Sequence, residues 1–324
     1  MNLIEKYQEM YEKIKAFKKI IITPHARPDG DCLGSALGLK DIIKSSFPEK
    51  EVFVSGESTS YLDFLGALDT LEDEDFKDAL VIAIDTANKD RIAEKRFDQG
   101  AYLIKVDHHI LVDSFGDLEI VDESSPAAAQ MVVDFYQANQ THLTLSPQGA
   151  LAIYTGILTD TGRFKYDGVS AKTFKAVALL YEHGLDPSIT HQALDVMSEE
   201  LIRFKGYVLL NMQKTENGVV YIKITDELRQ QFKVTTEEAS SLVNELGHFK
   251  DCPIWVLMAE YEEKIVRARI RSKGPTISTT ANLFDGGGHA KASGANLGTW
   301  EKADELLKVL DEVAKNYKLD EKGA

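Results

Sequence analysis

The sequence has 324 residues, of which 44% are hydrophobic and 27% charged, and its formal net charge is −15. A chain of this length is expected to form two domains, and its acidity excludes a surface that follows long duplex nucleic acid, which needs a broad basic footprint. No apolar run approaches the roughly 18 residues of a membrane span, and acids lie among the N-terminal lysines, so we expect a cytoplasmic protein that does not associate with membranes.

The first half of the chain alternates short apolar runs with helical patterns. The apolar runs predict strands at residues 18–23, 51–55, 79–85, 102–107 and 118–121. Apolar spacing, in several cases after Pro or Ser, predicts helices at residues 2–18, 32–43, 90–97, 126–135, 147–161 and 170–184. This alternation predicts an α/β fold with a parallel sheet in an N-terminal catalytic domain, residues 1–188.

The second half of the sequence predicts a helical linker at residues 189–213, followed by a smaller, mixed α/β domain at residues 214–324. This second domain is expected to bind the substrate. The turn signal Asn217-Gly218 precedes its first strand. The expected elements are a strand, a helix, a hairpin and a closing helix, at residues 219–225, 235–245, 254–271 and from residue 300.

Acidic residues and histidines follow several of the apolar runs. Residues 102–107 lead into Asp107, His108 and His109, and the residues that we predict as metal ligands are His25, Asp29, Asp31, Asp85, His109 and Asp160. Because open α/β sheets bind ligands at the carboxyl ends of their strands, these side chains are expected to converge. Carboxylates and imidazoles without thiolates favour Mn²⁺, Mg²⁺ or Co²⁺ over a structural zinc ion.

Six such ligands suffice for two divalent ions about 3.5–4 Å apart, which generate hydroxide at neutral pH and stabilise an in-line displacement at phosphorus. We predict that Asp85 bridges the ions, that His108 contacts the phosphate or assists the leaving group, and that Asp107 orients a ligand. The alternative for Asp107-His108-His109 is a helix cap beside hydrogen-bonded histidines. Cys32 is interpreted as a small packed residue rather than a ligand.

An anion-binding element is expected in the second domain. Arg267, Arg269 and Arg271 alternate in a predicted strand and so share one face, where guanidinium groups can bind phosphate bidentately. The run Gly286-Gly287-Gly288 before His289 lets backbone amides approach a ligand closely. The alternatives are a solvated edge strand for the arginines and a hinge for the glycines.

The order of these motifs resembles that of a known family. His25-x3-Asp29-x-Asp31, Asp85, Asp107-His108-His109 and Thr159-Asp160-Thr161-Gly162 resemble the four motifs of DHH-superfamily phosphoesterases, and Arg271-Ser272-Lys273 with Gly286-Gly287-Gly288-His289 resembles their associated C-terminal domain. The resemblance extends over nearly the whole chain and is greatest to the nanoRNase and pAp phosphatase type. Ile110 stands where that family usually has proline.

The resemblance implies a manganese-dependent hydrolase of oligoribonucleotides and of 3′-phosphoadenosine 5′-phosphate (pAp), with 5′ mononucleotides and AMP as products. The acidic surface limits the expected oligomers to about two to five nucleotides. By resemblance, one ion lies on His25, Asp29 and Asp85, and the other on Asp31, Asp85, His109 and Asp160. Substrate is expected in an interdomain cleft on Arg269, Arg271, Ser272, Gly286, Gly287, Gly288 and His289.

Related functions share these motifs. A phosphodiesterase for linear di-adenylate or cyclic di-AMP is the first alternative. A family II pyrophosphatase and a non-catalytic nucleotide sensor are further ones, and a homodimer is compatible with each.

Overall fold

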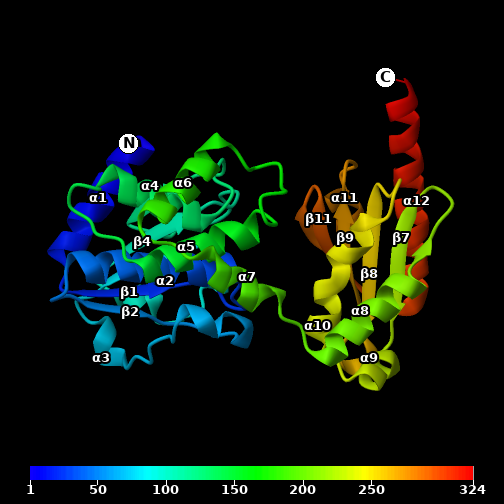
Figure 1. The fold of residues 1–324 in the computed structure, drawn as a ribbon, viewed down its shortest axis with the longest axis horizontal. Helices are drawn as coiled ribbons and strands as arrows, with labels where there is room; N and C mark the ends of the chain where they lie inside the picture. Colours follow the sequence, from blue (N-terminus) through cyan, green and yellow to red (C-terminus); the bar gives the residue numbers. More distant parts are fainter. Residues whose placement is uncertain (324) are drawn as a thin grey trace. The chain divides into compact units, whose positions relative to one another are not determined.

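The computed structural model describes residues 1–323, which form two compact units divided between Val196 and Met197 (Figure 1). The division falls within the expected linker, which consists of two helices, α7 (Pro187–Asp195) and α8 (Glu199–Asn211). The side chain of Ser198 accepts a hydrogen bond from the N–H of Leu201 and so begins the second helix. No helix within residues 1–323 is long and apolar enough to cross a membrane.

A five-stranded sheet organises the first unit. Its strands lie in the order β2-β1-β3-β4-β5, at Glu51–Val54, Lys19–Thr23, Leu80–Ile84, Tyr102–Asp107 and Leu118–Val121. All neighbouring pairs are parallel, which confirms the predicted α/β fold. The central strand, β3, is buried along its whole length, so Asp85 leaves the sheet at its middle.

Helices cover mainly one face of this sheet. They are α1 (Leu3–Ala16), α2 (Gly30–Ser46), α3 (Asp73–Phe76), α4 (Ala128–Ala138), α5 (Pro147–Asp160) and α6 (Ala171–Glu182), with 3-10 turns at Ser60–Leu65, Lys89–Arg91 and Phe97–Gln99. Ile20, Ile22 and Ile82 pack in the core formed with the longer helices. Ile21 and Val81 face the other way and pack with Phe76 of α3 and with loop residues.

The prediction of a helix at residues 90–97 is wrong. This segment instead pairs with the loop after β1, where the N–H of Ala26 donates to the carbonyl oxygen of Arg91 at 2.6 Å. His25 and Ile92 form an antiparallel bridge. Long-range backbone hydrogen bonds therefore replace the local helix, and they hold the loop that carries His25.

Helices α2 and α5 pack with their backbones unusually close. A Cβ added at Gly34 of α2 would lie 2.5 Å from the carbonyl oxygen of Ala152 and 2.8 Å from the nitrogen of Gly156, both in α5. Only glycine permits this separation. The contact sets the start of α2, with Asp31, beside the end of α5, with Asp160.

The second unit contains a six-stranded mixed sheet. Its strands lie in the order β10-β11-β9-β8-β7-β6, at Gly287–His289, Ala292–Gly298, Val266–Ser272, Ile254–Glu260, Val219–Ile224 and Gln213–Lys214. Strands β7 and β8 are parallel and the other neighbours antiparallel. The hairpin predicted at residues 254–271 is confirmed as β8 and β9.

Helices pack on both faces of the mixed sheet. On one face α12 (Trp300–Gly323) and α11 (Ser278–Asn282) pack against alternate residues of β8, β9 and β11. On the other face α8, α9 (Asp226–Phe232) and α10 (Thr236–Ser241) cover β7 and β8. The helix predicted at residues 235–245 is shorter than expected, because the chain continues as a 3-10 segment, Leu242–His248, that packs on the sheet.

Candidate metal centre

Side chains from three strands and two helices meet at one edge of the parallel sheet. His25 follows β1, Asp85 follows β3, and Asp107 ends β4 immediately before His108 and His109. The start of α2 and the end of α5 add three carboxylates: Asp29, Asp31 and Asp160. The strands are parallel, so their carboxyl ends share this edge, as expected from the sequence.

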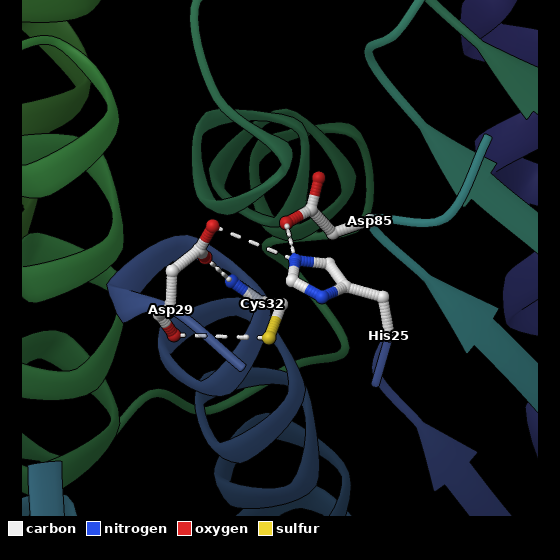
Figure 2. Close-up of side chains that lie close together, drawn as sticks. All are labelled: His25, Asp29, Cys32 and Asp85. Carbon is white, nitrogen blue, oxygen red and sulfur yellow. Dashed lines mark hydrogen bonds and ion pairs between the residues drawn. The ribbon is translucent and has the colours of Figure 1, made fainter. Parts of the chain in front are cut away.

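The first cluster surrounds the imidazole of His25 (Figure 2). Its Nε2 lies 3.5 Å from Asp29 Oδ2 and 3.6 Å from Asp85 Oδ2. Its Nδ1 lies 2.9 Å from the carbonyl oxygen of Ala26. A carbonyl oxygen can only accept, so Nδ1 carries the proton and Nε2 presents the lone pair that a metal ligand needs.

Asp29 and Cys32 complete this cluster (Figure 2). Asp29 caps α2, since its Oδ1 accepts hydrogen bonds from the N–H groups of Asp31 and Cys32, each at 3.1 Å. Burial and the charges of Asp29 and Asp85 raise the pKa of the Cys32 thiol. A protonated thiol is a poor ligand, and this agrees with the interpretation of Cys32 as a packed residue.

The second cluster surrounds His108. Its Nε2 lies close to three carboxylates, at 3.4 Å from Asp85 Oδ1, 3.4 Å from Asp160 Oδ2 and 3.6 Å from Asp31 Oδ2. Its Nδ1 lies 3.1 Å from the carbonyl oxygen of Ser125 and therefore carries the proton. Asp85 thus directs Oδ2 to the first cluster and Oδ1 to the second, which is the arrangement of a bridging carboxylate.

His109 lies beside Asp85 and Asp107. Its Nδ1 lies 2.8 Å from Asp107 Oδ1, and this is the same nitrogen that faces Asp85 at 3.6 Å. Nε2 of His108 lies beside Asp31 and Asp160, where His109 was expected, while His108 and His109 both lie beside Asp85 as candidate ligands. Asp107 orients His109, as a residue behind the ligands would.

Asp31 is held by the backbone of α4. Its two carboxylate oxygens accept hydrogen bonds from the N–H groups of Ala128, at 2.7 Å, and Ala129, at 2.9 Å. These N–H groups begin the helix and have no partner within it. Burial and the charges of Asp85 and Asp160 raise the pKa of Asp31 well above its usual range.

The carboxylates around His108 lie close enough to one another to raise the pKa of Asp31 and of Asp160. Burial raises the pKa of Asp160 to about 6, although His108 opposes the change. Burial lowers the pKa of His108, but the adjacent carboxylate of Asp85 and the charges of Asp31 and Asp160 raise it to about 10. Carboxylates gathered at this density pair with cations when they remain ionised.

Asp85 gives a direct test of whether a cation fits. Its Oδ1 is buried and accepts no hydrogen bond from any of the described residues. Its φ of +56° is a conformation that costs a non-glycine residue about 1–3 kcal/mol. A buried carboxylate that is held in a strained conformation between two groups of candidate ligands fits a site for divalent cations better than a packed core.

One supporting residue was not identified from the sequence. Lys105 in β4 is fully buried, and its Nζ donates to the carbonyl oxygens of Ala87, at 2.9 Å, and Asp113, at 2.8 Å. Nζ also lies 3.7 Å from Asp107 Oδ2. Lys105 could have been found from the sequence, because a lysine within an otherwise apolar strand needs a buried partner, here Asp107.

The predicted substrate-binding residues lie on β9, on β10 and directly before β10, all in the second unit. Arg269 pairs with Gly294, and Arg271 with Ala292. Gly288 has a φ of +130°, and a Cβ there would lie 2.6 Å from the carbonyl oxygen of Ala292, so the hairpin that presents His289 requires glycine.

Ser272 differs from the expectation. Its hydroxyl donates to the carbonyl oxygen of Pro275 at 2.6 Å and accepts from the N–H of Gly274 at 3.0 Å. The side chain is buried and shapes this turn.

Comparison with known proteins is consistent across the chain. Residues 19–157 match the DHH family, N-terminal domain, and residues 216–316 match the DHHA1 domain. A Bacillus subtilis protein named bifunctional oligoribonuclease and PAP phosphatase NrnA is 36% identical over 310 residues, which are 95% of this chain and 99% of that protein. A Streptococcus mutans protein named as a probable enzyme of the same kind is also 36% identical, over 95% and 99% of the two chains. The crystal structure of an exopolyphosphatase-related protein from Bacteroides fragilis, 26% identical, has a TM-score of 0.85 over 97% of this chain and 96% of that one.

Proposed function

We propose that this chain, which belongs to the DHH family, hydrolyses short oligoribonucleotides to 5′ mononucleotides and pAp to AMP. The observation that carries the proposal is the carboxylate of Asp85, whose two oxygens face two separate clusters of candidate ligands. Relatives named for both activities match the chain over almost their whole length, which supports the same substrates here.

The two clusters are proposed to hold two divalent ions, with Mn²⁺ preferred because carboxylate oxygens predominate over imidazoles. The ligands of one ion would be His25, Asp29 and Asp85, and those of the other Asp31, Asp85, His108 and Asp160. When bound, such a pair lowers the pKa of a water molecule and stabilises charge on the phosphate oxygens.

The side chains of the protein have separate tasks in this proposal. The carbonyl oxygens of Ala26 and Ser125 fix the tautomers of His25 and His108, so both present Nε2. Asp107 holds Nδ1 of His109, which assigns Nε2 of that ring to the phosphate or the leaving oxygen.

Substrate binding is proposed for the second unit. Guanidinium groups of Arg269 and Arg271 bind phosphate oxygens, and the glycines before His289 allow backbone N–H groups to approach them. The hydroxyl of Ser272 is engaged in its own turn, so its proposed contribution is to position Arg271.

The first experiment is to incubate the protein with Mn²⁺ and a 5′-labelled ribotrinucleotide and to follow the products over time. Stepwise conversion to mononucleotide is expected, with no conversion by the Asp85→Asn protein. An intact trinucleotide in Mn²⁺ would contradict the proposal.

Parallel reactions separate the alternatives. pAp, linear di-adenylate and pyrophosphate are supplied under the same conditions, and turnover of pyrophosphate alone would replace the proposed function by that of a pyrophosphatase. Tight nucleotide binding without turnover of any of the four compounds would indicate a sensor.

A further inference from the structure

A hollow lies on the exposed part of the mixed sheet, away from the glycine and histidine hairpin tip. Its volume is about 280 Å³, near the lower limit for small-molecule sites. The polar and charged residues that line it come from β9, β11 and the segments beside them: Tyr261, Arg267, Arg269, Asp285 and Asn296. All of them belong to the second unit.

The two arginines of this hollow are exposed. Arg267 and Arg269 have no ion-pair partner within the part of the chain that the structure describes. The guanidinium carbon of Arg267 lies 4.8 Å from the centre of the Tyr261 ring. The hydroxyl of Tyr261 lies 3.1 Å from Ser240 Oγ, so the ring that supports Arg267 is itself held in place.

Three arginines occupy alternate positions of β9, the strand labelled in Figure 1. Alternate residues of a strand lie on one face about 6.8 Å apart, so the backbone positions of Arg271, Arg269 and Arg267 recur at this interval on one face of the sheet. The facing residues of β11 are small or amide-bearing, namely Ala292, Gly294 and Asn296. The row is thus open on one side, and its interval is comparable with that between successive phosphates of an extended single strand.

We infer that Arg267, supported by Tyr261 and with Asn296 beside it, forms a phosphate subsite for the distal part of an oligonucleotide. The inference rests on the proposed function and extends it. A substrate held at Arg271 reaches the hollow only if it has further nucleotides, and Asp285 offers a carboxylate acceptor there to a ribose hydroxyl or a base amino group. The subsite therefore favours oligonucleotides over pAp.

Arg267→Ala tests this inference through steady-state kinetics with a 5′-phosphorylated ribotrinucleotide and with pAp. A charge-assisted contact to phosphate is lost, so the KM for the trinucleotide should rise about tenfold or more, while the KM for pAp should change less than twofold. Arg267→Lys should restore only part of the effect, because lysine keeps the charge but loses the planar, bidentate group. Lys308→Ala, on exposed α12 over the opposite sheet face, is the matched charge control and should change neither KM.

Salt dependence gives an independent signature of phosphate contact. For a single strand, the slope of log affinity against log salt should become shallower by about 0.7 in Arg267→Ala. Equal changes in KM for both substrates, or an unchanged KM for the trinucleotide, would overturn the inference.

Binding separates this inference from the proposed function. Fluorescence anisotropy of the labelled trinucleotide on the Asp85→Asn protein, with and without Arg267→Ala, requires no turnover. If the unmodified protein cleaves neither substrate but Arg267→Ala still weakens trinucleotide binding, the proposed function fails and the subsite stands. If cleavage occurs and binding is unaffected by Arg267→Ala, the subsite fails alone.

Discussion

Replacing Gly34 with alanine tests whether the close packing of α2 and α5 holds the metal centre together. The new Cβ would meet the backbone of Ala152 and Gly156 at 2.5 and 2.8 Å, and backbone atoms cannot rotate away, so the helices must separate. Overpacking of this kind costs about 1–3 kcal/mol. Alanine regains about 1 kcal/mol of helix propensity, so we expect a net loss of up to about 2 kcal/mol in the free energy of unfolding.

Gly206→Ala is the matched control. Gly206 lies within α8, and a Cβ there meets no atom within 4 Å, so this substitution should stabilise the protein by about 0.5–1 kcal/mol. Subtracting the two changes cancels helix propensity and leaves the overpacking cost. Both tryptophans, Trp255 and Trp300, belong to the second unit, so fluorescence follows its unfolding by urea, and circular dichroism reports both units.

The metal centre should respond to the same substitution. Separation of α2 from α5 moves Asp31 away from Asp160, so the affinity for Mn²⁺, measured by calorimetry, should fall in Gly34→Ala and stay unchanged in Gly206→Ala. A Gly34→Ala protein as stable as the Gly206→Ala protein would refute the packing argument. A destabilised protein with full Mn²⁺ affinity would refute the link between this contact and the ligands.

Asp85→Asn should raise the melting temperature of the metal-free protein in differential scanning fluorimetry, because asparagine tolerates a positive φ and removes a buried charge. The same substitution should abolish the increase in melting temperature that Mn²⁺ causes in the parent protein. His108→Ala should weaken Mn²⁺ binding in calorimetry, whereas His109→Ala should retain binding and lower kcat; the opposite pattern would restore the original expectation. Hydrogen bonds from Arg96 hold the pKa of Glu94 below its usual value of 4.5, so the stability lost in Glu94→Gln, measured by urea unfolding, should be full above that pH and shrink as the pH falls below it.

The position of the candidate ligands at one edge of the parallel sheet could be predicted, because two local sequence patterns indicate it. An apolar run predicts a buried strand, and an acidic or imidazole residue directly after it predicts where that side chain leaves the sheet. Asp85 and Asp107 follow this rule on neighbouring strands. Parallel pairing then brings residues that are distant in sequence to one edge.

The prediction of a helix at residues 90–97 is wrong because the segment pairs with a part of the chain that is distant in the sequence. Ile92 pairs with His25, 67 positions earlier, and such a partner leaves no periodic signal in the segment itself. The same holds for Asp31, whose hydrogen bonds come from N–H groups 97 and 98 positions later. Apolar spacing predicts which face of an element is buried, but not which distant backbone group it meets.

The choice between His108 and His109 shows where prediction from sequence ends. Two successive residues after a strand point to different sides, so the sequence indicates that the two rings differ without indicating which one enters the cluster. The decision comes from acceptors: the carbonyl oxygen of Ser125 holds Nδ1 of His108, and Asp107 holds Nδ1 of His109. The first of these contacts directs Nε2 of His108 at three carboxylates, and it comes from a backbone carbonyl 17 residues away that the motif does not encode.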